Sequence, residues 1–299
     1  MDLVTTRTLS KAFIEDILAK AQGYEKAARE KKNLSVLKGK TLATLFFEPS
    51  TRTQMSFQAA MLRLGGNFVG FTDPKSTSAS KGETLADTIR VVEGYAHAIV
   101  MRHAVEGAPA RAAELTDLPV INAGDGSNQH PSQALLDLYT IRQEKKTIDG
   151  LTILLAGDLK YGRTVHSLMY ALAHYDVDIQ LFSPPSLKMP ESIVADVRNR
   201  VSVKEVTDFG DADVVYATRV QRERFADAEE YQRSLYTIDE DLLAKIKSDA
   251  IILHPLPRVN EIAPEVDADP RAKYFQQSFY GVPTRMAILE TLIGSAEND

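Results

Sequence analysis

Thr41-Leu-Ala-Thr-Leu-Phe-Phe-Glu-Pro-Ser-Thr-Arg-Thr53 is an apolar run that leads directly into hydroxyl side chains and one guanidinium. The apolar part predicts a buried strand over 41–47. The residues that follow predict a helix over 51–64, ended by Gly65-Gly66, with an apolar stripe of Met55, Ala59 and Leu62. The same change from a short apolar run to an amphipathic stretch recurs along the chain. Such alternation is typical of parallel sheets covered by helices on both faces, so this stretch indicates an α/β fold.

Ser50, Thr51, Arg52 and Thr53 stand where this helix begins. The first N–H groups of a helix have no partner inside it and lie at the positive end of its dipole, so they attract anions. These residues therefore predict a phosphate site. The alternative is an ordinary capped helix start, because Ser and Thr are common N-cap residues. Further polar and cationic residues at strand ends and in loops favour the phosphate site: Lys81, Arg102, His130, Gln133, Arg163, Arg219 and Arg258.

The same order of elements continues to the end of the chain. Predicted strands span 41–47, 98–101, 120–123, 151–156, 179–182, 214–217 and 251–253, and predicted helices span 51–64, 83–95, 132–145, 164–174, 191–200, 239–247 and the residues from about Pro283 onward. The helix over 132–145 is expected to be amphipathic. Polar motif residues follow several strands at their C-terminal ends, which is where open α/β sheets bind ligands.

The length of 299 residues exceeds what one modest core needs, so two domains are expected. The polar segment 145–150 separates two series of elements. We therefore predict an α/β protein of two doubly wound parallel-sheet domains linked by helices. The first spans 1–146 and the second 147–283, and a C-terminal helix of about 284–299 returns to the first.

Composition excludes several classes of function. A net charge of -6 argues against general nucleic-acid binding, so an anionic ligand needs a local cluster of cations. The chain has no Cys, and its six His show no metal-ligand spacing, so we expect neither disulfides nor a metal site. No apolar run reaches about 18 residues and the first residues lack a leader pattern. A cytoplasmic location without a membrane partner is the expectation.

One motif has a rival interpretation. Gly157-Asp-Leu-Lys-Tyr-Gly-Arg-Thr164 follows a predicted strand with nearly the spacing of a phosphate-binding P-loop. Arg163 stands where that loop needs a slim Lys, and no second glycine gives the dinucleotide fingerprint. We therefore expect Arg163 to clamp a carboxylate or phosphate, and a nucleotide-dependent enzyme stays a weak alternative.

Seven motifs in order carry a resemblance to a known family. They are Phe46-Phe-Glu-Pro-Ser-Thr-Arg-Thr53, Lys81-Gly-Glu-Thr-Leu-Ala-Asp-Thr88, Val100-Met-Arg-His103, Gly124-Asp-Gly-Ser-Asn-Gln-His-Pro-Ser-Gln133, Gly157 to Thr164, Thr218-Arg-Val-Gln221 and His254-Pro-Leu-Pro-Arg258. Almost from end to end, the chain resembles the aspartate/ornithine carbamoyltransferase family and, within it, the aspartate carbamoyltransferase catalytic chains. The resemblance implies attack of the α-amino group of L-aspartate on carbamoyl phosphate, a step of pyrimidine synthesis, with no cofactor.

The resemblance also implies roles for residues. The catalytic group is Arg52, Thr53, Lys81, Arg102 and His130; the carbamoyl phosphate site comprises these five with Ser50, Thr51, Ser78, Gln133, Pro255 and Leu256. Arg52 would neutralise the leaving group, while Thr53, Arg102 and His130 would polarise the carbamoyl oxygen. Gln133 and the Leu256 carbonyl would orient the carbamoyl NH2. The alternative for His130 is a locally bonded histidine at a helix start.

Aspartate has two carboxylates, which favour two guanidinium clamps. The resemblance implies an aspartate site of Lys81, Arg163, Arg219, Gln221, Leu256 and Pro257. Solvated surface arginines are the alternative. Relatives that use ornithine typically carry a Cys in the segment where this chain has Pro255, so aspartate is the expected substrate.

The family further implies a homotrimer in which one chain supplies a Ser and a Lys to its neighbour's active site. Lys81 is the expected Lys, and Ser78 is favoured over Ser80. The Leu256-Pro257 bond is expected to be cis, as is typical of the family. Regulatory chains that make the trimer allosteric are compatible with the sequence, as is a non-catalytic anion-binding module on the same fold, although the intact set Arg52, Arg102, His130 and Gln133 argues against the module.

Overall fold

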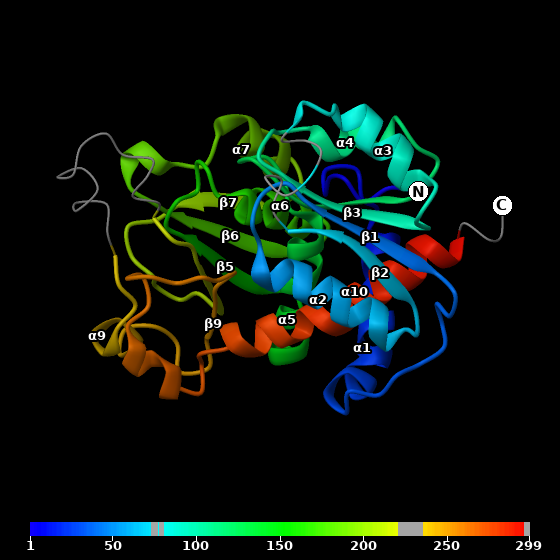
Figure 1. Ribbon diagram of the computed structural model, residues 1–299. Helices are drawn as coiled ribbons and strands as arrows, with labels where there is room; N and C mark the ends of the chain where they lie inside the picture. The colour runs from blue at the N-terminus through cyan, green and yellow to red at the C-terminus, as the bar shows by residue number, and fades with distance from the viewer. Residues whose placement is uncertain (73–76, 78–80, 221–235, 296–299) are drawn as a thin grey trace. The chain divides into compact units, whose positions relative to one another are not determined.

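The computed structural model describes residues 1–72, 77, 81–220 and 236–295 (Figure 1). It divides into two compact units, which are described separately here. Unit 1 comprises Met1–Tyr139 and Phe279–Asp299, and unit 2 comprises Thr140–Ser278. These divisions fall inside the helices α5 (Pro131–Lys145) and α10 (Tyr274–Ser295), a few residues before the boundaries expected from the sequence.

Unit 1 contains a parallel sheet of four strands in the order β2-β1-β3-β4. The strands are β1 (Thr41–Phe46), β2 (Asn67–Phe71), β3 (Ala98–His103) and β4 (Val120–Asp125), and the helices between them are α2 (Thr51–Arg63), α3 (Leu85–Glu93) and α4 (Ala108–Ala113). The helix α1 (Lys11–Arg29) precedes the sheet. The chain runs outward from β1 to β2 and then returns to place β3 on the other side of β1.

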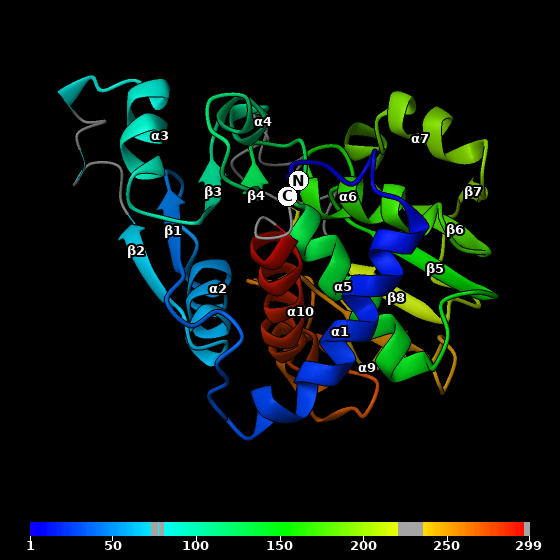
Figure 2. The same cartoon turned by 90° about the vertical axis from the view of Figure 1, so that its right-hand side faces the viewer.

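Helices cover both faces of this sheet (Figures 1 and 2). Ala43 and Leu45 of β1 face a core that includes Ile89 of α3 and Ala112 of α4. Thr44 points to the opposite face, where its hydroxyl accepts a hydrogen bond from Gln58 of α2 at 3.4 Å. The alternating side chains of β1 therefore fill two cores, as a doubly wound sheet requires.

Unit 2 contains a parallel sheet of five strands in the order β7-β6-β5-β8-β9. The strands are β5 (Leu151–Ala156), β6 (Val177–Phe182), β7 (Ser202–Glu205), β8 (Val214–Ala217) and β9 (Ile251–Leu253); the helices are α6 (Arg163–Leu172), α7 (Glu191–Arg198) and the short α9 (Glu240–Leu243). Leu154 and Ala156 of β5 face a core with Val215, Ile238 and Leu243. The helices α6 and α7 lie on the other face (Figure 1). The predicted fold class, two parallel sheets covered by helices on both faces, is confirmed.

The predicted apolar stripe of α2 is wrong. Met55 and Leu62 are 63% and 48% exposed, while Phe57, Ala60 and Met61 are fully buried. The helix is turned by the burial of Thr53 and Gln54 in its first turn, two polar residues that a hydropathy pattern assigns to the surface. The helix itself begins and ends within one residue of the prediction.

Two other helices also differ from their predictions. Every residue from Pro131 to Ile141 of α5 is buried, including Ser132, Gln133 and Asp137, so this helix is not amphipathic. The last helix begins at Tyr274 and continues through Pro283, which the sequence prediction took as its start. No helix in the described part of the chain is long and apolar enough to span a membrane.

Candidate active site

The strand order of unit 1 reverses between β1 and β3, and the chain leaves the C-terminal ends of these two strands in opposite directions. Phe46 and Arg102 are paired in register at these ends, and the Phe47 N–H donates to the Arg102 carbonyl at 2.9 Å. Ligands of open α/β sheets bind in the crevice at such a reversal. The fold therefore brings the start of α2 and Arg102 to one place.

The start of α2 has a residue that commonly caps helices but does not cap this one. Ser50 is its N-cap residue, with φ -159° and ψ 97°, but its side chain makes no cap hydrogen bond. Ser10, Thr84 and Asp239 do cap α1, α3 and α9, through bonds of 2.9 to 3.1 Å. The ordinary capped start, which was the alternative to a phosphate site, is thus not what α2 has.

The side chains of this first turn differ in their exposure to solvent. Thr51 and Arg52 are exposed, whereas Thr53 is buried. Although the Arg52 side chain reaches solvent, the protein around it removes part of the hydration of its guanidinium, and this desolvation lowers its pKa. A bound anion would offset that loss of hydration, so the position suits phosphate binding.

Arg102 is held by a carboxylate that the sequence analysis gave no role. Its Nη2 donates to Glu48 Oε1 at 2.5 Å, and its Nη1 is 3.5 Å from the Ala123 carbonyl oxygen. Its side chain is 13% exposed. The signal for Glu48 lay inside the first motif, as the one acidic residue between the strand and the helix.

His103 and Phe47 form the apolar side of this strand edge. Their rings lie 5.1 Å apart, and Phe47 also meets Phe71 edge-on at 5.0 Å. The Val105 N–H donates to His103 Nδ1 at 2.9 Å. Burial lowers the pKa of His103, which favours a neutral ring beside Arg102.

A buried carboxylate, Asp125, shapes the loop that leads to His130. It accepts hydrogen bonds from the side chains of Asn122 and Asn128 and from the N–H groups of Gly107 and Gln129, at 2.7 to 3.1 Å. A carboxylate with four donors fixes the backbone around it. The sequence analysis missed this role, although the Gly-Asp-Gly sequence at 124–126 was a turn signal.

His130 and Gln133 lie at the start of α5 and are 3% and 7% exposed. The Ser132 hydroxyl is 3.4 Å from His130 Nδ1. The Gln133 side chain donates through Nε2 to Asp137 Oδ1 at 2.8 Å. Unit 1 thus contains the predicted residues Ser50, Thr51, Arg52, Thr53, Lys81, Arg102, His130 and Gln133; of these, Lys81 is exposed.

In unit 2 the strand order reverses between β5 and β8, and the two predicted aspartate clamps follow these two strands. Arg163 is the first residue of α6, and Arg219 comes two residues after β8. Both side chains are half-buried. The Thr218 N–H donates to the Ala156 carbonyl at 2.8 Å, and Tyr236 bonds to the Ala156 and Thr218 carbonyls at 3.1 and 2.9 Å. These contacts fix the two strand ends.

The glycines of the P-loop-like motif have a packing reason. Gly157 has φ +112°, and a Cβ there would lie 2.4 Å from the Thr218 carbonyl oxygen; a Cβ at Gly162 would lie 2.4 Å from the Asp158 carbonyl oxygen. Both positions exclude larger residues. The glycine spacing is therefore explained by the close approach of the chain after β5 to the chain after β8 and by the turn into α6, without a nucleotide.

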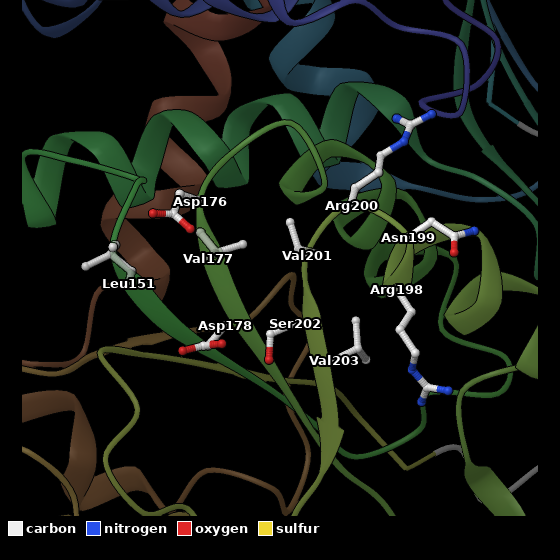
Figure 3. A pocket seen from close by; sticks show the side chains of 11 residues that line it. Leu151, Asp176, Val177, Asp178, Arg198, Asn199, Arg200, Val201, Ser202 and Val203 are labelled. Atoms are coloured by element: carbon white, nitrogen blue, oxygen red, sulfur yellow. The ribbon is translucent and has the colours of Figure 1, made fainter.

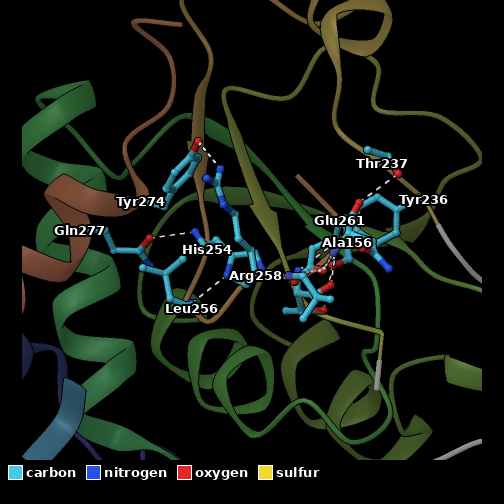
Figure 4. Close-up of polar contacts among 12 residues, drawn as sticks. Ala156, Tyr236, Thr237, His254, Leu256, Arg258, Glu261, Tyr274 and Gln277 are labelled. Atoms are coloured by element: carbon cyan, nitrogen blue, oxygen red, sulfur yellow. Dashed lines mark hydrogen bonds and ion pairs between the residues drawn. The ribbon is translucent and has the colours of Figure 1, made fainter. Parts of the chain in front are cut away.

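The His254 to Arg258 segment is held by buried polar contacts (Figure 4). His254 Nε2 and Glu261 Oε1 are 2.8 Å apart, and the Leu256 N–H donates to His254 Nδ1 at 2.8 Å. The Leu256-Pro257 bond is cis, as expected, and Leu256 has φ +55°. Arg258 pairs with both carboxylate oxygens of Asp267 and therefore has a structural role. Pro255 and Leu256 are half-buried, and Pro257 is exposed.

A hollow of about 660 Å³ lies elsewhere on unit 2, beside Leu151, Val177 and Ser202. These residues begin β5, β6 and β7, so the hollow is at the opposite edge of the sheet from Arg163 and Arg219. The side chains of Arg198 and Arg200 point away from each other (Figure 3). This hollow is not part of the candidate site.

Three predicted residues lie outside the described residues, namely Ser78, Ser80 and Gln221. Within the described part of the chain, no group of three or more His, Asp or Glu side chains is arranged to hold a metal ion. His254 and Glu261 are residues whose buried contacts the sequence analysis did not anticipate.

Both halves of the chain match known family profiles. Residues 1–143 match the aspartate/ornithine carbamoyltransferase carbamoyl-P binding domain, and residues 149–292 match the Asp/Orn binding domain of the same family. Together these matches span nearly the whole chain.

Individual relatives agree with the profiles. The chain is 55% identical to the aspartate carbamoyltransferase catalytic subunit of Thermococcus gammatolerans over 300 residues, which cover 98% of this chain and 97% of the relative. Among solved structures, it is similar to the catalytic subunit of M. jannaschii aspartate transcarbamoylase, with a TM-score of 0.92 and 49% identity over 100% of this chain and 99% of that one. A Trypanosoma cruzi aspartate transcarbamoylase in complex with carbamoyl phosphate and aspartate has a TM-score of 0.92 and 39% identity, over 97% and 96% of the two chains. The chain therefore belongs to the aspartate/ornithine carbamoyltransferase family.

Proposed function

We propose that this protein transfers the carbamoyl group of carbamoyl phosphate to the α-amino group of L-aspartate, giving N-carbamoyl-L-aspartate and phosphate, as a step of pyrimidine biosynthesis. Its family membership and its likeness to aspartate transcarbamoylases support this function. The observation that carries the proposal is the start of α2, where Ser50 leaves the helix uncapped beside Arg52, at the same strand reversal as Arg102.

The reaction suits a site built from fixed cations and neutral donors. Attack of the amine creates a tetrahedral oxyanion, and departure of phosphate leaves a dianion, so both charges need stabilisation at fixed positions. Ser50, Thr51, Arg52 and Thr53 bind the phosphate, and Arg52 neutralises its growing charge. Thr53, Arg102 and His130 donate to the carbamoyl oxygen. His130 acts as a neutral donor, and the departing phosphate accepts the amine proton.

Aspartate is the acceptor substrate in this proposal. Arg163 and Arg219 bind its two carboxylates, with Gln221 beside Arg219, and Leu256 and Pro257 complete the site. The position of these two arginines after the strands on either side of the reversal in unit 2 supports this assignment. Gln133, Pro255 and the Leu256 carbonyl orient the carbamoyl NH2 group.

The active enzyme in this proposal is a cytoplasmic homotrimer. Ser78 and Lys81 of one chain enter the active site of the neighbouring chain, where Lys81 contributes a further cation. The exposure of Lys81 in the single chain is compatible with that role.

The direct test is formation of a ureido product from carbamoyl phosphate with L-aspartate and, separately, with L-ornithine. We expect product with aspartate alone. Arg52→Ala should lower kcat by about 100-fold, because one fixed donor to a developing charge contributes roughly 3 kcal/mol. Arg111→Ala is the matched control, since Arg111 is a solvent-exposed arginine of the same unit that pairs only with the exposed Glu114 among the described residues.

The outcomes separate the alternatives. Product with ornithine would assign the chain to the other branch of its family. Phosphate binding without product from either acceptor would indicate a non-catalytic anion-binding module. Equal loss of activity in Arg52→Ala and Arg111→Ala would remove the phosphate role of Arg52.

A further inference from the structure

A buried carboxylate, Asp137, lies one helical turn after Gln133 on α5. Gln133 Nε2 donates to Asp137 Oδ1 at 2.8 Å, and the Asp137 side chain is fully buried. Side chains four residues apart share one face of a helix, so the contact follows from the spacing. An ionised carboxylate only accepts hydrogen bonds and therefore selects the NH2 end of the Gln133 amide. The amide oxygen of Gln133 is then directed away from Asp137.

A buried arginine on α10 provides positive charge near this carboxylate. Arg285 is 3% exposed. Burial lowers its pKa to about 10, and the negative charge of Asp137 acts in the opposite direction. The two charges thus stabilise each other in a part of unit 1 that excludes water.

The position of the Arg285 guanidinium is set by its packing. Its Cζ lies 5.0 Å from the centre of the Phe57 ring on α2, within the range of a cation–π contact. A Cβ at Gly281 would lie 2.2 Å from Arg285 Nη1, so the glycine one turn earlier on α10 makes room for it. Arg285 therefore contacts the helix that begins with the phosphate-binding residues and carries the charge that balances Asp137.

This arrangement is unfavourable for stability alone. Within the described residues, the Arg285 Nε–H has no hydrogen-bond partner. A buried donor without a partner destabilises a fold, and apolar residues of similar volume commonly replace buried charges without loss of stability. Stability alone therefore does not explain the two buried charges of Asp137 and Arg285.

We propose that Asp137 is a positioning residue that holds the Gln133 amide with its oxygen facing the carbamoyl NH2 group, and that Arg285 is the buried cation that balances its charge. The inference rests on the proposed function, in which Gln133 orients that NH2 group. It adds that selection of the carbamoyl group depends on two buried charges that do not touch the substrate.

Acetyl phosphate is the probe that isolates this effect. It has a methyl group where carbamoyl phosphate has NH2, so it shares the phosphate and carbonyl contacts but donates no hydrogen bond to Gln133. The measured quantity is the ratio of carbamoyl phosphate kcat/KM to the affinity for acetyl phosphate, obtained from its inhibition constant as a competitor. A general loss of structure lowers both kcat/KM for carbamoyl phosphate and the affinity for acetyl phosphate. Rotation of the Gln133 amide lowers only kcat/KM for carbamoyl phosphate.

Asp137→Asn is the first variant, because its amide can both donate and accept and so permits either orientation of Gln133. We expect kcat/KM for carbamoyl phosphate to fall about 10-fold or more, as for a lost hydrogen bond in a buried site, with the inhibition constant of acetyl phosphate unchanged within about twofold. Asp137→Leu combined with Arg285→Met replaces both charged side chains with apolar side chains of similar volume. No unbalanced charge is then left buried, so this variant should still fold. It should show the same selective loss.

Gln133→Met separates the inference from the proposed function. Selective loss in Gln133→Met and in the Asp137 variants supports the inference. Selective loss in Gln133→Met, with Asp137→Asn and the double variant like wild type, overturns it and leaves the proposed function intact. A parallel loss of both ligands in the Asp137 variants also overturns it, because the role is then merely structural. If wild type forms no product, the proposed function itself has failed.

Discussion

Arg258 and Arg102 both belong to motifs at the C-terminal ends of strands, yet their surroundings give them different roles. Arg258 donates to both carboxylate oxygens of Asp267 and to the Tyr274 hydroxyl, and this pairing lowers the pKa of Asp267. Two hydrogen bonds to one carboxylate and a third to a hydroxyl leave the Arg258 guanidinium little freedom to bind a ligand. Arg102 instead donates to Glu48 at the strand reversal. The chemistry available to an arginine thus depends on partners far along the chain.

Glu261 gives a prediction that concerns a single titrating group. It accepts hydrogen bonds from His254 and from the Val259 and Asn260 N–H groups at 2.8 to 3.1 Å. Burial raises the pKa of Glu261, but these bonds and the charge of His254 bring it below its usual value of 4.5. Because the folded pKa is the lower one, ionised Glu261 stabilises the fold above that value, and the contribution is lost as pH falls through the folded pKa.

Glu261→Gln should therefore lower the free energy of unfolding by roughly 1 to 3 kcal/mol at pH 7, as expected when buried donors lose a charged acceptor. The difference from wild type should shrink as the pH falls below about 4.5. Urea unfolding at pH 7 and pH 4 measures both values. A difference that is the same at the two pH values would contradict the linkage.

At the scale of elements, the helix starts fall into two groups. Side chains cap α1, α3 and α9, whereas the N-cap residues of α2, α4, α6 and α7 make no side-chain cap bond. The second group includes the two helices on which the sequence predicts anion sites, and Ser50 of α2 is its one member whose side chain could have capped the helix. An N-terminus without a cap keeps its N–H groups available to a ligand, at the expense of helix stability.

Ser10 and Ser50 are a matched pair for testing this difference. Ser10→Ala removes a cap and should lower the free energy of unfolding by about 1 kcal/mol, with phosphate affinity unchanged. Ser50→Ala should change stability by less than about 0.5 kcal/mol and weaken phosphate binding several-fold, because only a ligand bond is lost. Urea unfolding and calorimetric titration with inorganic phosphate measure the two effects. The reverse pattern would show that Ser50 is an ordinary cap residue after all.

The turn after β5 gives a second prediction at this scale. Gly157→Ala places a Cβ 2.4 Å from the Thr218 carbonyl oxygen at φ +112°, so it should destabilise unit 2 by about 2 kcal/mol or more. Gly23→Ala is the control, since Gly23 lies inside α1 with nothing within 4 Å of the added Cβ, and it should stabilise by about 0.5 to 1 kcal/mol. Thermal unfolding of both variants is the measurement. Equal stability of Gly157→Ala and wild type would mean that the strand ends adjust freely.

Elements with a strong local pattern could be predicted from the sequence, and those shaped by distant contacts could not. The strands β1, β5, β8 and β9 are continuous apolar runs. The edge strand β2 is mostly exposed and was missed, whereas α1 was missed although Ser10 and the spacing of Ile14, Ile17 and Leu18 indicate a helix. The stripe of Met286, Leu289 and Ile293 predicts a last helix from about Pro283 onward, but α10 begins at Tyr274 and continues through this proline, although proline is rare inside helices.

The residues of the candidate site also fall into those that the sequence predicts and those that it does not. Its polar residues at strand ends could be predicted, because parallel strands bring their C-terminal ends to one edge and the motifs resemble those of a family. The residues that hold them could not. Arg285 meets Phe57 across more than half of the chain, and nothing local to either residue signals that contact.

On the scale of the whole molecule, both units repeat one arrangement. Each has a parallel sheet whose strand order reverses once, and each has predicted cations where the strands that flank the reversal end: Arg52 after β1 and Arg102 near the C-terminal end of β3 in unit 1, and Arg163 and Arg219 after β5 and β8 in unit 2. Lys81 does not fit this arrangement, because it lies shortly before α3 rather than at the end of a strand that flanks the reversal. A neighbouring chain is the partner proposed for it.

Mixed trimers test whether Lys81 serves a neighbouring chain. Lys81→Ala and Arg52→Ala should each be nearly inactive, because each lacks one cation of every site. If the site is shared, a trimer assembled from equal amounts of the two variants contains sites that take Lys81 from one chain and Arg52 from the other. After the variants are denatured and refolded together, random assembly makes about one quarter of all sites intact in this way. About a quarter of wild-type activity should therefore return. Arg52→Ala mixed with His130→Ala is the control and should stay inactive, since both residues belong to the same side of the site. No return of activity in the test mixture would place Lys81 and Arg52 of one site on a single chain, whereas activity in the control would show that Arg52 and His130 of one site come from different chains.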